Sequence, residues 1–310
     1  LSMNLTNGFT GQFSLGQAGF MAIGAYVVGI FTVPVALRPA VFYAAPMNPL
    51  IADIYMPLWL ALIIGGLLAA LVAFMIGTPV LRLRGDYLAV ATLGFSEIIR
   101  IVITNAQSIT NGALGIKDIP PLNDVRYIFA FTAVIFVFIT ALINSSYGRA
   151  FKAIREDEIA AEAMGIDLFK HKCLAFMISA FFAGIGGGLY GALLGTVDPK
   201  NFLFTLTYNF LLIIVLGGMG SITGSMIGAV LVTAGLEFLR VFDEPLDLFG
   251  MAIPLFRPGF RMVIFSVLLM VLVLFWRHGI MGTREFTWDN FFAFCKNPFG
   301  FFGRKGAHKA

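Results

Sequence analysis

The chain has 310 residues, of which 59% are hydrophobic and only 12% are charged. A soluble domain carries about 25% charged and about 45–50% apolar residues, so this composition excludes a water-soluble globular protein and a disordered chain. The net charge of +4 is explained by basic residues in loops that set membrane topology, and nucleic acid is not expected as a partner.

Long apolar runs predict membrane-spanning helices, because a helix needs about 20 apolar residues to cross the hydrocarbon core. The stretch 1–8 is interpreted as the end of a helix that begins before residue 1. Eight spans are expected after it, at 14–32, 58–80, 88–104, 127–144, 173–196, 202–219, 222–242 and 261–276. The predicted fold class is therefore all-α, a polytopic transmembrane helical bundle.

Two of these runs are expected to depart from a regular helix. The run 14–32 is rich in glycine and alanine, which favours an irregular start. The run 202–219 ends in Gly217-Gly218-Met219-Gly220, which favours a broken or re-entrant segment. Irregular backbone is tolerated at membrane depth only where protein or water covers it.

Basic residues are distributed unequally between the two sides that these spans imply. With the spans alternating, the inner segments 81–87, 145–172 and 277–310 hold thirteen Lys and Arg residues, against five in the outer loops. Positive residues favour the cytoplasmic side, so we expect a cytoplasmic C-terminus. We expect a permease domain at 1–276, which contains the cytoplasmic loop 145–172, and a cytoplasmic tail at 277–310 with many basic and aromatic residues.

The segment 145–172 is charged and helix-prone, although it lies between two expected spans. Its residues predict a short amphipathic helix at roughly 149–164, at the cytoplasmic surface, with Gly165 as its stop. Ala160 and Ala161 are small enough to permit close docking of a partner surface. An ordinary solvated connector is the alternative interpretation.

Glu97 and Arg100 lie within an expected span, where an ionisable residue indicates a functional site by default. Their i, i+3 spacing also allows a purely structural ion pair, and both interpretations remain open. Glycines at four-residue spacing predict close helix contacts, either within the chain or with a partner subunit. These helix-packing glycines are Gly184, Gly188 and Gly191 in one run and Gly220, Gly224 and Gly228 in another.

Several motifs together resemble a known family. Ala160-Ala161-x-x-x-Gly165 is similar to the EAA loop of ABC-importer permeases, although Ile159 stands where that motif has Glu. Further matching stretches are Asn7–Gly16, Arg82–Tyr87, Thr92–Arg100, Gly148–Asp157 and Leu216–Ser221. As a set they resemble the LivM-type permeases of branched-chain amino acid ABC transporters. The family often has His where this chain has Gln17.

The resemblance implies a transmembrane permease subunit in the plasma (inner) membrane of a prokaryote, transporting Leu, Ile and Val and coupled to a cytoplasmic ATPase. It implies as partners a LivH-type second permease, two ATPase subunits, a periplasmic or extracellular amino-acid-binding protein, and membrane lipid. Coupling to the ATPase is assigned to Gly148, Arg149, Phe151, Arg155, Glu156, Ala160, Ala161 and Gly165. A mildly polar translocation pathway for a zwitterion is assigned to Thr92, Gly94, Ser96 and Glu97. Replacing Ala161 with Trp is expected to obstruct docking.

The sequence contains no G-x-x-x-x-G-K-[ST] phosphate loop, so ATP hydrolysis is expected on partner subunits and this chain is not expected to be an enzyme. No catalytic residue, metal or cofactor is expected on it. A permease for urea or another small polar solute of the same superfamily is one alternative. A stand-alone secondary transporter is a second, which accounts for the hydropathy but not for the docking helix.

Overall fold

The computed structural model describes residues 1–43, 45–83, 85–122 and 125–239, and beyond them the short pieces 247–248, 251–252, 264, 266–267, 270 and 279–282. The described residues are almost entirely helical, so the all-α fold class is confirmed. Besides loops, the described residues hold one two-residue hairpin, β1 (Asp247–Leu248) paired antiparallel with β2 (Met251–Ala252), and an isolated antiparallel bridge between Ile116 and Val197.

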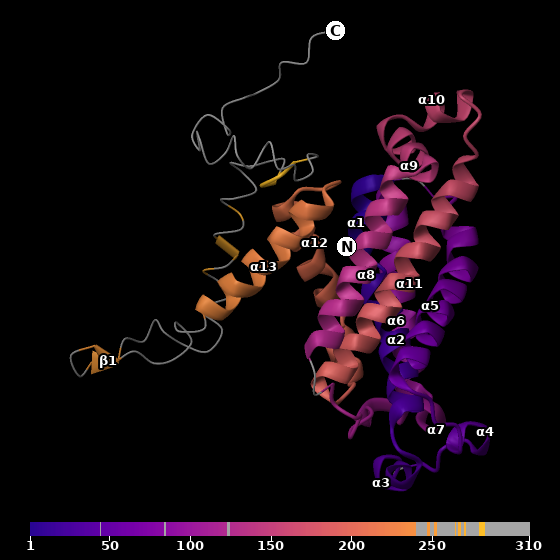
Figure 1. Ribbon diagram of the computed structural model, residues 1–310, viewed down its shortest axis with the longest axis vertical. Helices are drawn as coiled ribbons and strands as arrows, with labels where there is room; N and C mark the ends of the chain where they lie inside the picture. The colour runs from indigo at the N-terminus through magenta and orange to yellow at the C-terminus, as the bar shows by residue number, and fades with distance from the viewer. Residues whose placement is uncertain are drawn as a thin grey trace. The chain divides into compact units, whose positions relative to one another are not determined.

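The helices follow one another along the chain with short connections (Figure 1). The first part holds α1 (Ser2–Asn4), the π-helix η1 (Leu5–Phe9), α2 (Gln17–Thr32), η2 (Val35–Leu37), α3 (Arg38–Val41), α4 (Pro49–Ala52), α5 (Leu58–Val80), α6 (Asp86–Asn105), α7 (Gln107–Thr110) and η3 (Gly112–Leu114). The second part holds α8 (Val125–Asn144), α9 (Ser146–Glu156), α10 (Glu158–Ala163), α11 (Leu168–Leu194), η4 (Pro199–Phe202), α12 (Phe204–Gly217) and α13 (Ile222–Phe238).

The chain divides into two compact units, residues 1–212 and 213–310. The division falls inside the region 1–276 that we expected to form one permease domain. The expected tail 277–310 lies outside the described residues except for 279–282, so that boundary stays a prediction.

The centre of the first unit is α11, which packs against both α2 and α5. Two thirds of its apolar window is buried, against 11% for α8. Glycines make the close approach possible: a Cβ atom on Gly187 would overlap the Met21 carbonyl of α2, and one on Gly184 would lie 2.9 Å from the Ala69 Cβ of α5. Small residues of this kind let helix backbones come close where no water is available to drive association.

The other predicted glycines of this run also lie at contacts within the chain. A Cβ on Gly188 would lie 2.7 Å from side-chain atoms of Leu62 and Val28, and one on Gly191 would lie 2.7 Å from Val197. The Gly-rich face of α11 therefore packs against other residues of the first unit. Of the two alternatives left open by the sequence, these glycines make contacts within the chain.

Short helices connect the long ones at both ends of the first unit. In Figure 1, α9 and α10 lie at one end of the helices and α3, α4 and α7 lie at the other. At the α3 end, the buried Arg38 side chain donates hydrogen bonds to the carbonyl groups of Val33, Ile51, Ala52 and Ile54. This single side chain ties the connection between α2 and α5 together.

The eight expected spans can be compared with the structure only where residues are described. Four described helices, α5, α6, α8 and α11, are long and apolar enough to cross a membrane, and two bent pairs raise the count to six. The expected spans 202–219 and 222–242 are the short helices α12 and α13, bent by 118° at the glycine-rich turn, and so form one broken element. The expected span 261–276 lies almost wholly outside the described residues.

In the second unit, glycines allow the end of α12 to cross the start of α13. Gly218 and Gly220 have φ of 117° and 89°, which other residues rarely adopt, and they form the turn before α13. A Cβ on Gly224 would overlap the Gly217 carbonyl, and one on Gly228 would lie 2.5 Å from the Ile213 carbonyl oxygen. Gly220 thus belongs to the turn, whereas Gly224 and Gly228 lie at the helix contact.

The contact between α11 and α2 predicts a sharp difference between two adjacent glycines. Gly187→Ala is expected to destabilise the protein by about 1–3 kcal/mol or more, because the new methyl group meets a backbone carbonyl that cannot move aside cheaply. A methyl group added at Gly186 would have no heavy atom within 4 Å, so Gly186→Ala is the matched control and should keep or raise the midpoint, because alanine favours the helix over glycine. Thermal unfolding in detergent measures both, and equal midpoints would contradict the packing described.

Candidate functional site

The most unusual feature of the first unit is a break in its N-terminal helical segment. The π-helix η1 ends at Phe9, and α2 begins only at Gln17, so the intervening backbone is not helical. Gly11 takes φ of 68° there. Although the surrounding helices are apolar, the side chains of the break are polar and buried: Thr6, Asn7, Thr10, Gln12, Ser14 and Gln17. The irregular start expected for the run 14–32 is confirmed.

Side chains supply the hydrogen bonds that a continuous helix would have made. The Asn7 carboxamide spans the break, because its Nδ2 donates to the Ser14 carbonyl and its Oδ1 accepts from the Ser14 amide. The Leu15 amide donates to Thr92 Oγ1 on α6 at 2.9 Å, and the Ala18 amide donates to Thr207 Oγ1 on α12 at 3.1 Å. Backbone at membrane depth must be satisfied internally, and this break meets that requirement through three different elements.

Two glutamines attach the break to α11. Gln12 Nε2 donates to the Lys172 carbonyl at 3.1 Å, and Gln17 Nε2 donates to Ser179 Oγ at 2.8 Å. Ser179 in turn donates to the Ser2 carbonyl at 2.7 Å. Each glutamine therefore links the polar break to the central helix of the unit.

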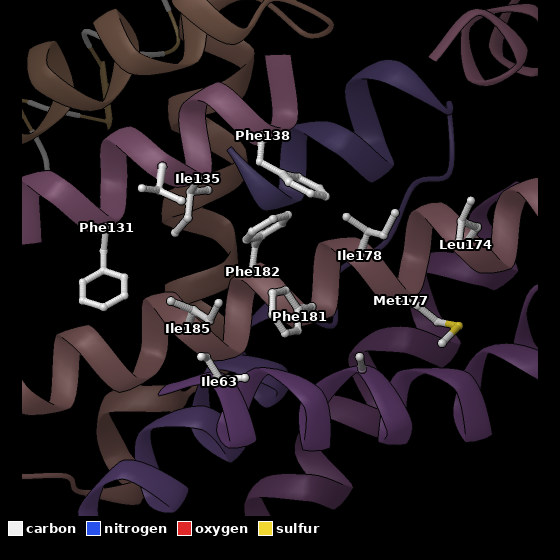
Figure 2. Close-up of a pocket in the computed structure, with 12 residues that line it drawn as sticks. Ile63, Phe131, Ile135, Phe138, Leu174, Met177, Ile178, Phe181, Phe182 and Ile185 are labelled. Carbon is white, nitrogen blue, oxygen red and sulfur yellow. The ribbon is translucent and has the colours of Figure 1, made fainter. Parts of the chain in front are cut away.

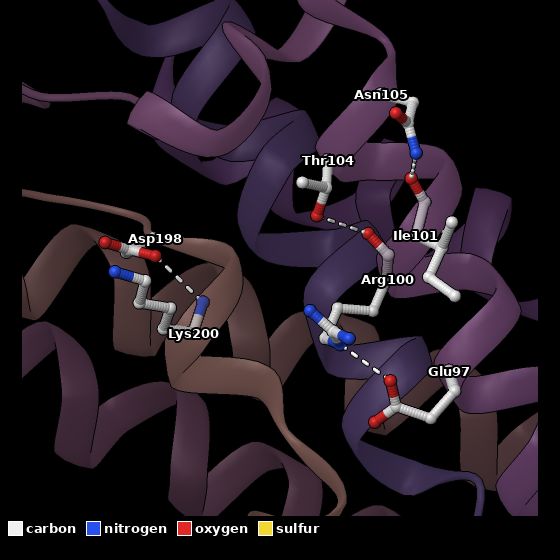
Figure 3. A network of polar contacts seen from close by, with 7 residues as sticks. All are labelled: Glu97, Arg100, Ile101, Thr104, Asn105, Asp198 and Lys200. Atoms are coloured by element: carbon white, nitrogen blue, oxygen red, sulfur yellow. Dashed lines mark hydrogen bonds and ion pairs between the residues drawn. The ribbon is translucent and has the colours of Figure 1, made fainter.

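The four residues expected to line a pathway on α6 lie on two different faces. Thr92 and Ser96 are buried against the break and α2, where Thr92 accepts from Leu15 and Ser96 lies under Gly19. Glu97 lies elsewhere and pairs with Arg100 at 2.7 Å, with both side chains partly exposed (Figure 3). A Cβ on Gly94 would meet no atom within 4 Å. The structure therefore forms the Glu97–Arg100 pair and separates it from Thr92 and Ser96.

The segment expected as one helix at 149–164 is two helices. α9 ends at Glu156, Asp157 is extended with φ of −157°, and its carboxylate accepts from the amides of Ile159 and Ala160 to begin α10. An Asp in this role is a strong N-cap, which the overall helix propensity of the segment concealed. Gly165 has φ of 86°, the left-handed conformation expected of a helix stop.

The residues assigned to coupling do not share one face. Gly148, Phe151 and Ala161 are buried within the chain, and Ala161 is only 3% exposed. Arg149, Glu156, Ala160 and Gly165 are exposed, and Arg155 is partly buried. Ala161 is packed inside this chain, because α10 places that side on α9 and α11, and its part in docking stays a prediction. A Trp at 161 would disturb this packing rather than only block a partner.

One exposed face of α10 is apolar. Ile159 and the adjoining Met164 are 78% and 83% exposed, and Ala160 and Ala163 are exposed beside them. At 100° per residue these four lie within about 140° of the helix circumference. We call this set the α10 face. On the opposite side, Lys172 of α11 pairs with Glu158 at 2.6 Å and holds α10 in place.

The α9 helix is bonded directly to the break. Arg155 Nη1 donates to the Gly8 carbonyl at 3.0 Å, and the Gln12 amide, which would pair with Gly8 in an α-helix, instead donates to the Thr6 carbonyl. The π-helix thus frees the carbonyl that Arg155 takes. A cation at a helix C-terminus is also favoured by the helix dipole. Arg155 pairs with Glu156 as well, so both charges are engaged within this chain.

Outside the break, the described residues hold a charged helix cap and an apolar cavity. Asp167 caps α11 by accepting from the Lys170 amide, and the side-chain hydrogen bond from Lys170 lowers the pKa of the Asp167 carboxyl. A cavity of about 470 Å³ among α5, α8 and α11 is lined by apolar side chains, among them Phe131, Phe138 and Phe181 (Figure 2). No cluster of three metal-ligating side chains occurs among the described residues.

Sequence reasoning missed the polar centre at Gln12, Gln17 and Ser179. Their contacts join positions 160 or more residues apart, so no local pattern reveals them. The available signal was the density of Thr, Asn, Gln and Ser between 6 and 17 in an otherwise apolar stretch.

Comparison with known proteins agrees with this architecture. The family described as "Branched-chain amino acid transport system / permease component" matches residues 1–274. The chain belongs to this family. This membership confirms the resemblance found in the sequence motifs. Together with the several apolar helices, it identifies a multi-pass membrane protein.

Individual relatives point the same way. The chain is 36% identical to the high-affinity branched-chain amino acid transport system permease protein LivM of Escherichia coli, over 79% of this chain and 61% of that protein. It is 27% identical to a probable LivM of Methanocaldococcus jannaschii, over 89% and 87%. It is 25% identical to the guanosine ABC transporter permease NupQ of Bacillus subtilis, over 89% and 85%. The chain thus spans about three fifths of the length of the Escherichia coli relative, and no solved structure matches it.

The bond between α9 and the break generates a prediction for Arg155. Arg155→Met keeps the aliphatic stem beside Gly11 but leaves the buried Gly8 carbonyl unpaired, which costs about 1–3 kcal/mol. We expect a lower unfolding midpoint and faster amide hydrogen exchange at residues 8–16. Arg149→Met is the control, because Arg149 is exposed and donates to Ser146 on its own helix. Unchanged exchange at 8–16 in Arg155→Met would contradict the role given to this bond.

Proposed function

We propose that this chain is the transmembrane permease subunit of an ATP-driven ABC importer for branched-chain amino acids. The observation that carries the proposal is the family match over residues 1–274. The names of the relatives in Escherichia coli and Methanocaldococcus jannaschii favour Leu, Ile and Val as substrates. ATP hydrolysis is assigned to partner subunits, because the family is one of permease components and the chain carries no phosphate loop.

The geometry supports a division of labour within the first unit. The break between η1 and α2 is assigned to the translocation pathway, since discontinuous helices with buried polar groups form substrate sites in membrane transporters. The α10 face is assigned to the ATPase. Arg155 joins the two, so movement of α9 and α10 on a partner would be transmitted to the carbonyl end of η1.

Partners and orientation complete the proposal. A LivH-type permease, two ATPase subunits and an external binding protein are the expected partners, in the plasma membrane of a prokaryote. The end that carries α9 and α10 is placed in the cytoplasm, in agreement with the excess of basic residues in 81–87 and 145–172. The C-terminus is placed on the same side.

Uptake by the reconstituted complex tests the proposal. The chain is combined in liposomes with its permease, ATPase and binding-protein partners, and accumulation of labelled Leu, Ile and Val is measured with and without ATP. ATP-dependent accumulation is the expected result. ATP-dependent accumulation of labelled guanosine or urea, with none of labelled Leu, Ile or Val, would overturn the substrate assignment.

The α10 face predicts where a steric block interrupts coupling. Ala160→Trp places a bulky side chain on this exposed face without disturbing internal packing, so membrane abundance should stay normal. Co-purification of the ATPase and ATP-dependent uptake should both fall at least tenfold. Glu162→Trp is the matched control, since Glu162 is exposed on the same helix about 130° from the centre of the face. Equal ATPase association of the two variants would show that α10 is a plain connector.

Orientation is tested separately by cysteine labelling. Cysteines introduced at Lys117 and Lys305 are expected on opposite sides of the membrane, because 117 lies in an expected outer loop and 305 in the expected cytoplasmic tail. A membrane-impermeant maleimide added to intact cells should label position 117 only. Labelling of both positions from the same side would contradict the topology.

A further inference from the structure

Two buried side chains in the break keep an oxygen without a hydrogen-bond partner. Gln12 and Gln17 are 3% and 1% exposed, and the Oε1 atom of each has no partner among the described residues. Their Nε2 atoms are both engaged by α11. Each side chain is thus held by its donor end and presents an acceptor that nothing in the described part of the first unit uses.

The hydrogen-bond partners on α11 show which atom of each glutamine carboxamide, nitrogen or oxygen, has no partner. The Lys172 carbonyl can only accept, so the atom of Gln12 that faces it must be the nitrogen. Ser179 has one hydroxyl proton, which it gives to the Ser2 carbonyl, so it too must accept from the atom that Gln17 presents. In both side chains the unused atom is therefore the oxygen.

These orphan oxygens contrast with the rest of the break. The side chains of Thr6, Asn7, Thr10 and Ser14 all have hydrogen-bond partners. A buried acceptor without a donor is unfavourable, and native proteins keep few of them without a functional reason. The Oε1 atoms of Gln12 and Gln17 share one chemistry, since both are hydrogen-bond acceptors and neither carries charge.

The two glutamine oxygens also lie one after the other along α11. Their anchors on α11, Lys172 and Ser179, lie seven residues apart, which is about 10 Å along the helix. The Gln12 oxygen is thus nearer the α9 end of the unit, and the Gln17 oxygen lies deeper, at the start of α2. A ligand moving along α11 past the break would meet one acceptor after the other.

We propose that the Oε1 atoms of Gln17 and Gln12 accept hydrogen bonds from the α-ammonium group of the transported amino acid when α2 and α11 separate. This inference rests on the proposed function and names the substrate contacts within it. Neutral carboxamide oxygens suit an ammonium in transit, because a buried carboxylate would bind the cation far more tightly and slow its release. Acceptors of this kind cannot serve the carboxylate end of the same zwitterion.

The test measures uptake of labelled leucine by the reconstituted complex. Gln17→Met has similar length but no acceptor, and it should lower the uptake rate about tenfold or more, as expected for the loss of a hydrogen bond to a charged group. Gln12→Met, assayed in parallel, should also lower it, and it decides the question if Gln17→Met fails to reach the membrane. ATPase association should be unchanged in both.

Two controls separate substrate contact from structural support. Ser179→Ala removes the anchor of Gln17 but keeps its oxygen, so its uptake should fall much less than that of Gln17→Met. Tyr26→Phe removes another buried polar atom without a partner among the described residues. Tyr26 lies nine residues after Gln17, about two and a half turns along α2 and on its opposite face, so this variant should transport like the wild type.

The outcomes distinguish this inference from the proposed function. If the wild-type complex does not accumulate leucine, the proposed function fails. If the wild type transports leucine and both methionine variants stay within twofold of it, the function stands and the glutamine contacts are wrong. Equal losses in Gln17→Met, Ser179→Ala and Tyr26→Phe would likewise overturn the contacts, because that pattern reports packing alone.

Discussion

The first unit depends on one constraint: the backbone between Phe9 and Gln17 leaves the helical conformation among apolar helices, and its polar groups must find partners there. A continuous helix satisfies itself, but a break calls on its neighbours. Asn7 bridges it from within, and Thr92 reaches it from α6. Arg155 of α9 and the backbone of the central helix α11 complete the set.

This requirement gives Thr92, one of the residues expected to line a pathway, a structural role in the break. Thr92 is expected from its chemistry to line a pathway, yet its hydroxyl accepts from the Leu15 amide and gives its one proton to the Ala89 carbonyl, so no donor is left. Gln12 and Gln17 show the opposite case, since each has one end taken and one end free. In a buried polar centre, the count of unused donors and acceptors is therefore a better guide to ligand contacts than residue type.

The sequence was sufficient for the elements that depend on local composition. The uncharged run 58–80 matches α5 residue for residue, and the Gly-rich run at 184–191 lies at helix contacts as expected. It was insufficient where tertiary contacts decide. The split at Asp157 depends on a cap that competes with a helix-prone segment, and the burial of Ala161 depends on α11, which arrives later in the chain. The pairing of Gln17 with Ser179 joins residues 162 positions apart.

The same central helix receives both the rigid and the polar contacts of the unit. Along its second half, α11 meets α2 and α5 through glycines, where backbones touch and any added side chain would overlap. Along its first half it meets the break and α10 through hydrogen bonds and the Lys172–Glu158 pair, which form and dissolve with small displacements. A dense glycine contact resists sliding, because it leaves no room for an intermediate arrangement. Relative motion of α2 and α11 is therefore cheapest at the polar half, which lies beside the break whose Gly8 carbonyl accepts a hydrogen bond from Arg155 of α9.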